Sequence, residues 1–161
     1  MSAAALVSWL LTAALGLYMF TIWLIEDDGR QDGAGYRRLR APVVFSHVGL
    51  AVIALGIWLV HLYIDLGWLD WVPICLLAVV AVLGVTMFTR WVPVHRLANA
   101  QARQLAEARV GADGSPLPVL PMTGLPPERN FPVTVVALHG IFAVTTVVLV
   151  LIVTLTAKHG L

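Results

Sequence analysis

Residues 132–157 read PVTVVALHGIFAVTTVVLVLIVTLTA, a stretch without a single Asp, Glu, Lys or Arg. About 20 apolar residues in a helix cross the hydrocarbon core of a bilayer. This stretch therefore predicts a membrane-spanning helix. Three earlier stretches have the same character, and we predict four spans in all, at 3–25, 42–64, 71–89 and 132–157.

The composition agrees with a membrane protein. Apolar residues make up 60% of the 161 residues and charged residues only 12%, whereas about a quarter of the residues in soluble domains are charged. The four spans use more than half of the chain, which leaves too little for a second folded unit. We predict an all-α membrane protein with one domain, 1–161, a four-transmembrane-helix bundle. We expect no internal repeat.

The basic residues predict the orientation. All nine arginines lie in two segments, 26–41 and 90–131, on one side of a four-span chain. Because Lys and Arg concentrate in cytoplasmic loops, we expect both segments in the cytoplasm and both chain ends outside. The abundance of Arg over a single Lys favours the plasma (inner) membrane of a bacterium, with the chain multi-pass. The net charge of +1 implies no nucleic-acid partner, and the lipid bilayer is the expected surrounding.

The long cytoplasmic loop, 90–131, changes character along its length. Residues 94–110 are rich in helix-forming Ala, Gln, Arg and Leu. We expect the third helix to continue, or to restart after Pro93, as an amphipathic piece at the membrane surface. Residues 115–132 contain six prolines, so we expect no helix there but an extended segment of polyproline-II character. It is either a stiff connector or a docking site for a partner subunit.

Three histidines lie within the predicted spans, namely His47, His61 and His139. An ionisable residue inside a bilayer is a functional candidate by default. His47 is five residues past Pro42 and His139 is seven past Pro132, which places the two within about 3 Å in depth at 1.5 Å per residue. Two imidazoles at one level on different helices could ligate a haem iron.

A second spacing involves His47 and His61, which are fourteen residues apart on one helix. At 100° per residue their side chains point to within about 40° of each other, and they are separated by about 21 Å along the axis. Both histidines therefore face one side of the helix, one in each leaflet.

The segment from His47-Val48-Gly49 to Val60-His61 is similar to membrane cytochromes b, which carry two histidines fourteen apart on one helix. The four-helix types are the cytochrome b561 group and the haem-bearing anchor subunits of membrane dehydrogenases, and they also take ligands from other helices. The resemblance covers three residues on the second and fourth helices. It implies a haem b with His47 and His139 as axial ligands of the iron, and electron transfer linked to quinone.

The outer leaflet departs from the two-haem pattern. Val153 stands fourteen residues after His139, where a second histidine is expected, and no other in-membrane histidine is available to pair with His61. The lone Cys75, which excludes an internal disulfide, lies at matching depth, and a second copy of the chain could also supply a ligand. We predict one haem b at the cytoplasmic level and leave a second haem at His61 open.

Other residues near the inner level have two interpretations each. Met19 is a packing residue or a replacement axial ligand. Gly84 could admit either a macrocycle or a neighbouring helix. The cluster at 26–28, Glu-Asp-Asp, is a solvated helix end or a site of proton uptake near a quinone.

Simpler expectations hold for the remaining polar residues. We expect Thr145 and Thr146 to bond back to carbonyls of their own helix. We expect His95, beside Arg96, and His159 on the solvated surface.

The functional hypothesis is a b-type haem-binding membrane subunit for electron transfer within a larger respiratory-type complex. Because the chain has no flavin, iron–sulfur or dehydrogenase motif, other membrane or peripheral protein subunits would complete a reaction. If the complex is an enzyme, the chain is an oxidoreductase subunit rather than the complete enzyme. The alternative is a cofactor-free structural or assembly subunit of a membrane complex. A transporter or channel is disfavoured because the spans contain no central Asp, Glu, Arg or Lys.

Overall fold

The computed structural model describes residues 2–28, 39–61, 63–64, 71–108 and 127–158. These residues form four α-helices and one short 3-10 helix, and no strand occurs among them. The elements are α1 (Ser2–Asp28), α2 (Ala41–His61), α3 (Val72–Ala108), η1 (Pro127–Asn130) and α4 (Val133–Lys158). Each α-helix is long and apolar enough to cross a membrane. The prediction of an all-α protein is confirmed for the described residues, as is that of four helices long and apolar enough to span a membrane.

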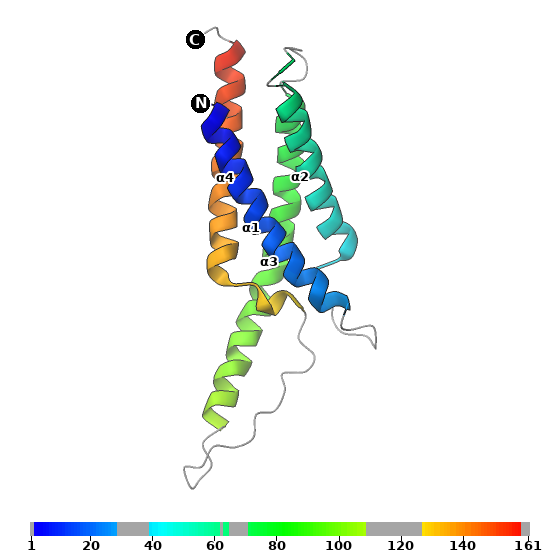
Figure 1. Ribbon diagram of the computed structural model, residues 1–161. Coiled ribbons are helices and arrows are strands. Elements are labelled where there is room, and N and C mark those ends of the chain that lie inside the picture. Colours follow the sequence, from blue (N-terminus) through cyan, green and yellow to red (C-terminus); the bar gives the residue numbers. More distant parts are fainter. Residues whose placement is uncertain (1, 29–38, 62, 65–70, 109–126, 159–161) are drawn as a thin grey trace.

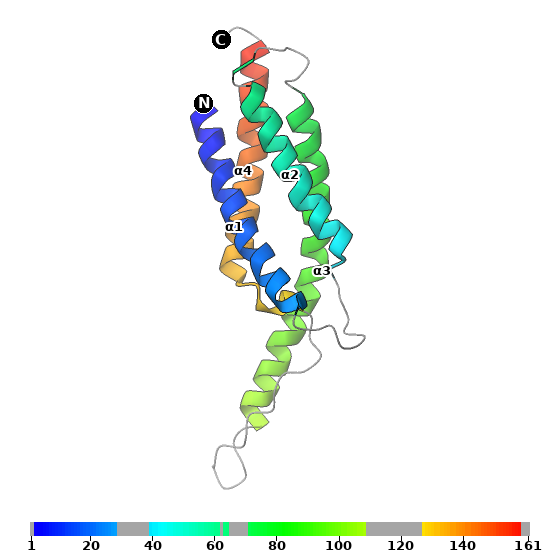
Figure 2. The same ribbon diagram turned by 45° about the vertical axis from the view of Figure 1, so that its right-hand side comes forward.

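The four helices pack as two pairs. Helix α1 lies along α4, and α2 lies along α3 (Figures 1 and 2). The pairs meet through smaller contacts of α1 with α2 and of α3 with α4. Among the described residues of the diagonal helices, no Cα atom of α2 lies within 8 Å of one of α4, and none of α1 lies within 8 Å of one of α3. Figure 1 shows the start of α1 and the end of α4 at the same end of the bundle, which we call the terminal end, and η1 at the opposite end, which we call the η1 end.

Prolines mark where helices begin and do not interrupt α3. Pro42 and Pro73 lie in the first turns of α2 and α3, where a missing N–H leaves no helical bond unmade. Of the two expectations for the third helix, continuation is confirmed, because α3 runs through Pro93 to Ala108. Its last turns project beyond η1, away from the other helices (Figure 1).

The buried apolar side chains form two clusters, one toward each end. The terminal cluster contains Ala5, Trp9, Ala54, Trp58, Leu77 and Val150. The η1 cluster contains Trp23, Leu39, Val44, Trp91 and Phe131. Large apolar side chains on the outside of the bundle, such as Leu17, Val82 and Val144, are more than half exposed, as expected for helices that face lipid.

The proline-rich segment contains a helical turn that the sequence did not predict. Residues 127–130 form η1, so the expectation of no helix in 115–132 is wrong there, and residues 115–126 lie outside the described part. The turn is held by tertiary contacts. The backbone N–H of Leu39 donates to the Glu128 carboxylate at 2.6 Å, and the indole N–H of Trp91 donates to the Glu128 carbonyl at 3.1 Å. These bonds tie η1 to α3 and to the residues that precede α2.

A second contact of η1 lies at the end of α1. The amide of Asn130 donates to the carboxylate of Glu26, which is half-buried. This exposed bond links η1 to α1. The side chains of the two acidic neighbours of Glu26 lie outside the described part.

A candidate two-histidine site

His47 and His139 meet at the centre of the bundle. Their ring centres are 6.4 Å apart, and their planes are inclined by 56°. His47 comes from α2 and His139 from α4, two diagonal helices whose backbones stay apart. The rings therefore come close to each other between diagonal helices, as expected from residue counts that put them at a similar level along the bundle.

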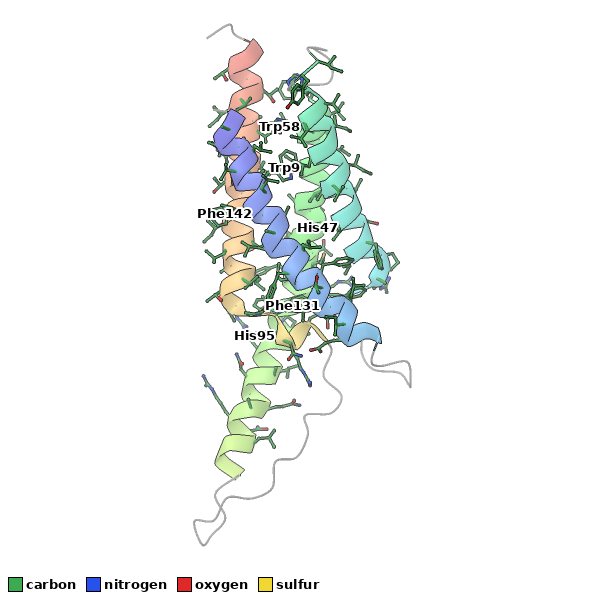
Figure 3. The ribbon with its side chains drawn as sticks, in the orientation of Figure 1. Trp9, His47, Trp58, His95, Phe131 and Phe142 are labelled. Carbon is green, nitrogen blue, oxygen red and sulfur yellow. The ribbon has the colours of Figure 1, made fainter. Side chains whose placement is uncertain are left out.

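The histidine pair lies between the two buried clusters. On α2, His47 follows Val44 of the η1 cluster and precedes Ala54 of the terminal cluster. On α4, His139 follows Val136, which packs against the η1 cluster, and precedes Val150 of the terminal cluster. Figure 3 shows His47 between the labelled tryptophans, Trp9 and Trp58, and the labelled Phe131. Apolar packing thus separates this polar layer from both ends of the bundle.

Each imidazole is oriented by a backbone carbonyl of the neighbouring helix. Nδ1 of His47 lies 3.0 Å from the carbonyl oxygen of Val80 on α3, and Nδ1 of His139 lies 3.0 Å from that of Thr12 on α1. Since a carbonyl oxygen only accepts, Nδ1 carries the proton in both rings, and a neutral ring then has its lone pair on Nε2. Both rings are therefore held in the tautomer that can ligate a metal through Nε2.

A glycine lies beside each ring. A Cβ atom added to Gly16 of α1 would be 2.9 Å from Cε1 of His139, and one added to Gly84 of α3 would be 3.2 Å from Cε1 of His47. The space at Gly84 is thus occupied by the imidazole of His47 from the neighbouring helix α2, in line with the second interpretation of that residue. Gly16 has the same role at the other ring and was not among the residues singled out from the sequence.

The separation of the rings fits an iron between them. A metal–imidazole bond is about 2.0–2.1 Å long and a ring nitrogen lies about 1.1 Å from its ring centre, so two imidazoles on opposite sides of one metal ion have centres about 6.3 Å apart. The observed separation is 6.4 Å. An Nδ1–H bonded to a carbonyl is also the usual way in which a metal-ligating histidine is held. Two neutral imidazoles form a donor set that haem iron accepts, because the macrocycle supplies its other ligands.

Cys75, the residue of α3 that we considered as a partner for His61, is exposed. The core on this side of the histidine pair is filled by Trp9 and Trp58, whose ring centres are 5.7 Å apart and of which Trp58 is only 1% exposed. His61 is half-buried one turn beyond Trp58.

His95 is not the surface residue that we expected. Its ring stacks on Trp91, with ring centres 4.9 Å apart and planes inclined by 23°, and its Nε2 accepts from the Asn99 amide at 2.9 Å. The ring is half-buried. The expectation of a solvated surface position is therefore wrong for His95, whereas His159 lies outside the described part. Met19 packs against the η1 cluster, in line with its packing interpretation.

Hydroxyl groups link α1 to α4 next to the site. Thr145 and Thr146 bond to the carbonyls four residues earlier, at 2.9 and 2.8 Å, as predicted. Thr146 also lies 2.9 Å from the hydroxyl of Ser8 and 3.3 Å from that of Thr12. Ser8 and Thr12 were not predicted to have a role. Two hydroxyl residues four apart on one face of an apolar span could, however, have indicated a polar contact with a neighbouring helix. This network fixes the turn of α1 whose carbonyl holds His139.

Comparisons with protein-family models, with curated proteins and with solved structures find no match to this chain.

Proposed function

We propose that this chain is a b-type haem-binding membrane subunit that transfers electrons within a larger respiratory-type complex. The observation that supports it is the His47–His139 pair, with ring centres 6.4 Å apart and both Nδ1 atoms on backbone carbonyls. The Nε2 atoms of His47 and His139 would hold the haem iron. In this function, one haem b is held at the histidine layer, and quinone in the bilayer is the proposed redox partner.

Bound haem would supply one-electron chemistry, and the residues of this chain would supply its environment. The carbonyls of Thr12 and Val80 hold the two rings and fix their tautomer. The terminal and η1 clusters, which include Trp58 at 1% exposure, keep water from both sides of the layer. A dry site held by apolar side chains is one of the means by which a protein tunes a haem.

The test is an absorption spectrum of the purified full-length chain. We expect a Soret band and, after reduction, the sharp α-band of low-spin haem b, with one haem per chain. A colourless preparation, even after haem is supplied during expression, would contradict the proposal. That result would favour the alternative, a cofactor-free structural or assembly subunit.

We further propose that the η1 end faces the cytoplasm of a bacterium, because the arginines are concentrated in the segments at that end. In a Cys75→Ala background, Tyr63→Cys at the terminal end is expected to react with a membrane-impermeant thiol reagent in intact cells. Gln101→Cys on the projecting part of α3 is expected to react only after the cells are permeabilised. Both positions are exposed. The reverse pattern of labelling would overturn this orientation.

A further inference from the structure

Helices α1 and α3 carry the same sequence pattern around their glycines. Residues 13–24 read AALGLYMFTIWL, and residues 81–92 read AVLGVTMFTRWV. With an offset of 68, seven of the twelve positions are identical, namely one each of Ala, Leu, Gly, Met, Phe, Thr and Trp. The expectation of no internal repeat is therefore wrong.

Helices α2 and α4 repeat as well, with an offset of 92. His47 corresponds to His139, since 139 − 47 = 92, and the pairs Val43-Val44 and Ala51-Val52 correspond to identical pairs on α4. Buried residues of the η1 cluster also correspond to one another. The offset of 68 relates Trp23 to Trp91, and the offset of 92 relates Leu39 to Phe131.

The contacts of the two histidines obey the same correspondence. His47 bonds to the carbonyl of residue 80 and lies over Gly84, and His139 bonds to the carbonyl of residue 12 and lies over Gly16. Both differences, 80 − 12 and 84 − 16, equal 68, the offset between α1 and α3. The first half of the chain, α1 and α2, thus accepts the hydrogen bond of His139 from the second half. The second half, α3 and α4, accepts that of His47 from the first. Such reciprocal contacts are the property of an interface with two-fold symmetry.

The glycine and the carbonyl act together because of helix geometry. A helical side chain leans toward the N-terminus and covers the turn before its own Cα. A side chain at residue 16 would therefore cover the carbonyl of Thr12, and one at residue 84 would cover that of Val80. With glycine at residue 16 or 84, the carbonyl four residues earlier stays uncovered. It can then accept a hydrogen bond from the imidazole in addition to the one within its own helix, because a carbonyl oxygen has two lone pairs.

We infer that Gly16 and Gly84 are equivalent positioning residues, which place the two imidazoles on opposite sides of a single ligand that lies on the two-fold axis of a duplicated helical hairpin. The inference rests on the proposed function for the identity of that ligand as haem. A planar haem has two axial faces and suits such a site. The repeat is not kept at the terminal end, where Val153 corresponds to His61 and Val150 to Trp58. A site of this two-fold kind is thus confined to the histidine layer.

The test compares two pairs of glycine variants in the full-length purified chain. Gly16→Ala and Gly84→Ala place a methyl group against a ring. The matched controls, Gly140→Ala and Gly49→Ala, lie beside the same histidines on α4 and α2, but their added Cβ would meet no described atom within 4 Å. We expect the midpoint potential of the haem to rise in both test variants and to stay unchanged in both controls. A weaker Nδ1–H bond makes the imidazole a poorer donor to ferric iron. The rise should be larger for Gly16→Ala, where the contact is 2.9 Å rather than 3.2 Å.

A second readout does not depend on haem. In haem-free protein with 15N-labelled histidine, Gly16→Ala should shift the Nδ1–H resonance of His139 alone, and Gly84→Ala that of His47 alone. The inference is overturned if the test variants match the controls in both measurements, or if only one ring responds. Wild-type protein that binds no haem would refute the proposed function, whereas these resonances would still decide the role of the glycines.

Discussion

His47→Ala and His139→Ala are each expected to abolish the low-spin spectrum of the purified protein. In the proposed function, each change would remove one of the two imidazoles that hold the iron, which would leave a high-spin haem or no bound haem at all. Loss of a supporting residue behind a metal ligand already costs about 10–100-fold in affinity, and loss of the ligand itself should cost at least as much. Haem content per chain and the absorption spectrum measure the effect.

Three further variants make this result specific. The double variant should be no worse than the worse single variant, because in the proposed function both rings would hold the same iron. His61→Ala should keep the low-spin spectrum, since His61 lies about 21 Å from His47 along α2. His47→Gly should recover a low-spin spectrum when imidazole is added, if its defect is the missing ligand rather than misfolding. Wild-type spectra in both single variants would disprove the assignment, and complete loss in His61→Ala alone would move the site to the terminal end.

The spans and the histidine pair could be predicted because both follow from local rules. A bilayer requires each spanning backbone to satisfy its own hydrogen bonds, so long apolar stretches such as 132–157 can only be helices. The regular rise of a helix then converts residue counts into depth, which placed His47 and His139 at one level. Their 6.4 Å separation required in addition that α2 and α4 lie diagonally across the bundle, and residue counts contain no information on that.

One of the two features that were missed depends on tertiary contacts. The 3-10 turn at 127–130 forms in a proline-rich segment because Glu128 bonds to Leu39 and Trp91, which are remote in sequence. The stacking of His95 on Trp91, by contrast, joins two residues four apart on α3. Residues with this spacing are neighbours on a helix surface, so the contact could have been recognised in the sequence.

The internal repeat is readable in the sequence but has no fixed period. The offset is 68 for α1 and α3 and 92 for α2 and α4, so the connection within the second half is 24 residues longer. A search for one constant spacing therefore fails. Comparison of helix with helix, centred on Gly16 and Gly84, recovers the repeat, and it marks Gly16 as the counterpart of Gly84 from residue types alone.

The second large effect is expected at the η1 end, for Glu128→Ala. The Glu128 side chain is 1% exposed, and its carboxylate accepts the backbone N–H of Leu39 at 2.6 Å. A hydrogen bond to a charged group contributes about 1.5–3 kcal/mol, and a buried donor left without its acceptor costs about 1–3 kcal/mol. We therefore expect the free energy of unfolding to fall by about 2 kcal/mol, measured as a lower Tm in detergent and as faster trypsin cleavage after the exposed Arg40.

Two companion variants separate the carboxylate from the turn that carries it. Glu128→Gln keeps an oxygen that can accept from Leu39, and should therefore lose less stability than Glu128→Ala. Asn130→Ala changes an exposed residue of the same turn and removes its bond to Glu26, so it should cost no more than about 1 kcal/mol and leave cleavage after Arg40 unchanged. All three should keep the low-spin haem spectrum, because the histidine layer lies between the two apolar clusters and apart from η1. If Glu128→Ala has the Tm and the cleavage rate of the wild type, the tie between η1 and the start of α2 contributes nothing to the stability of the bundle.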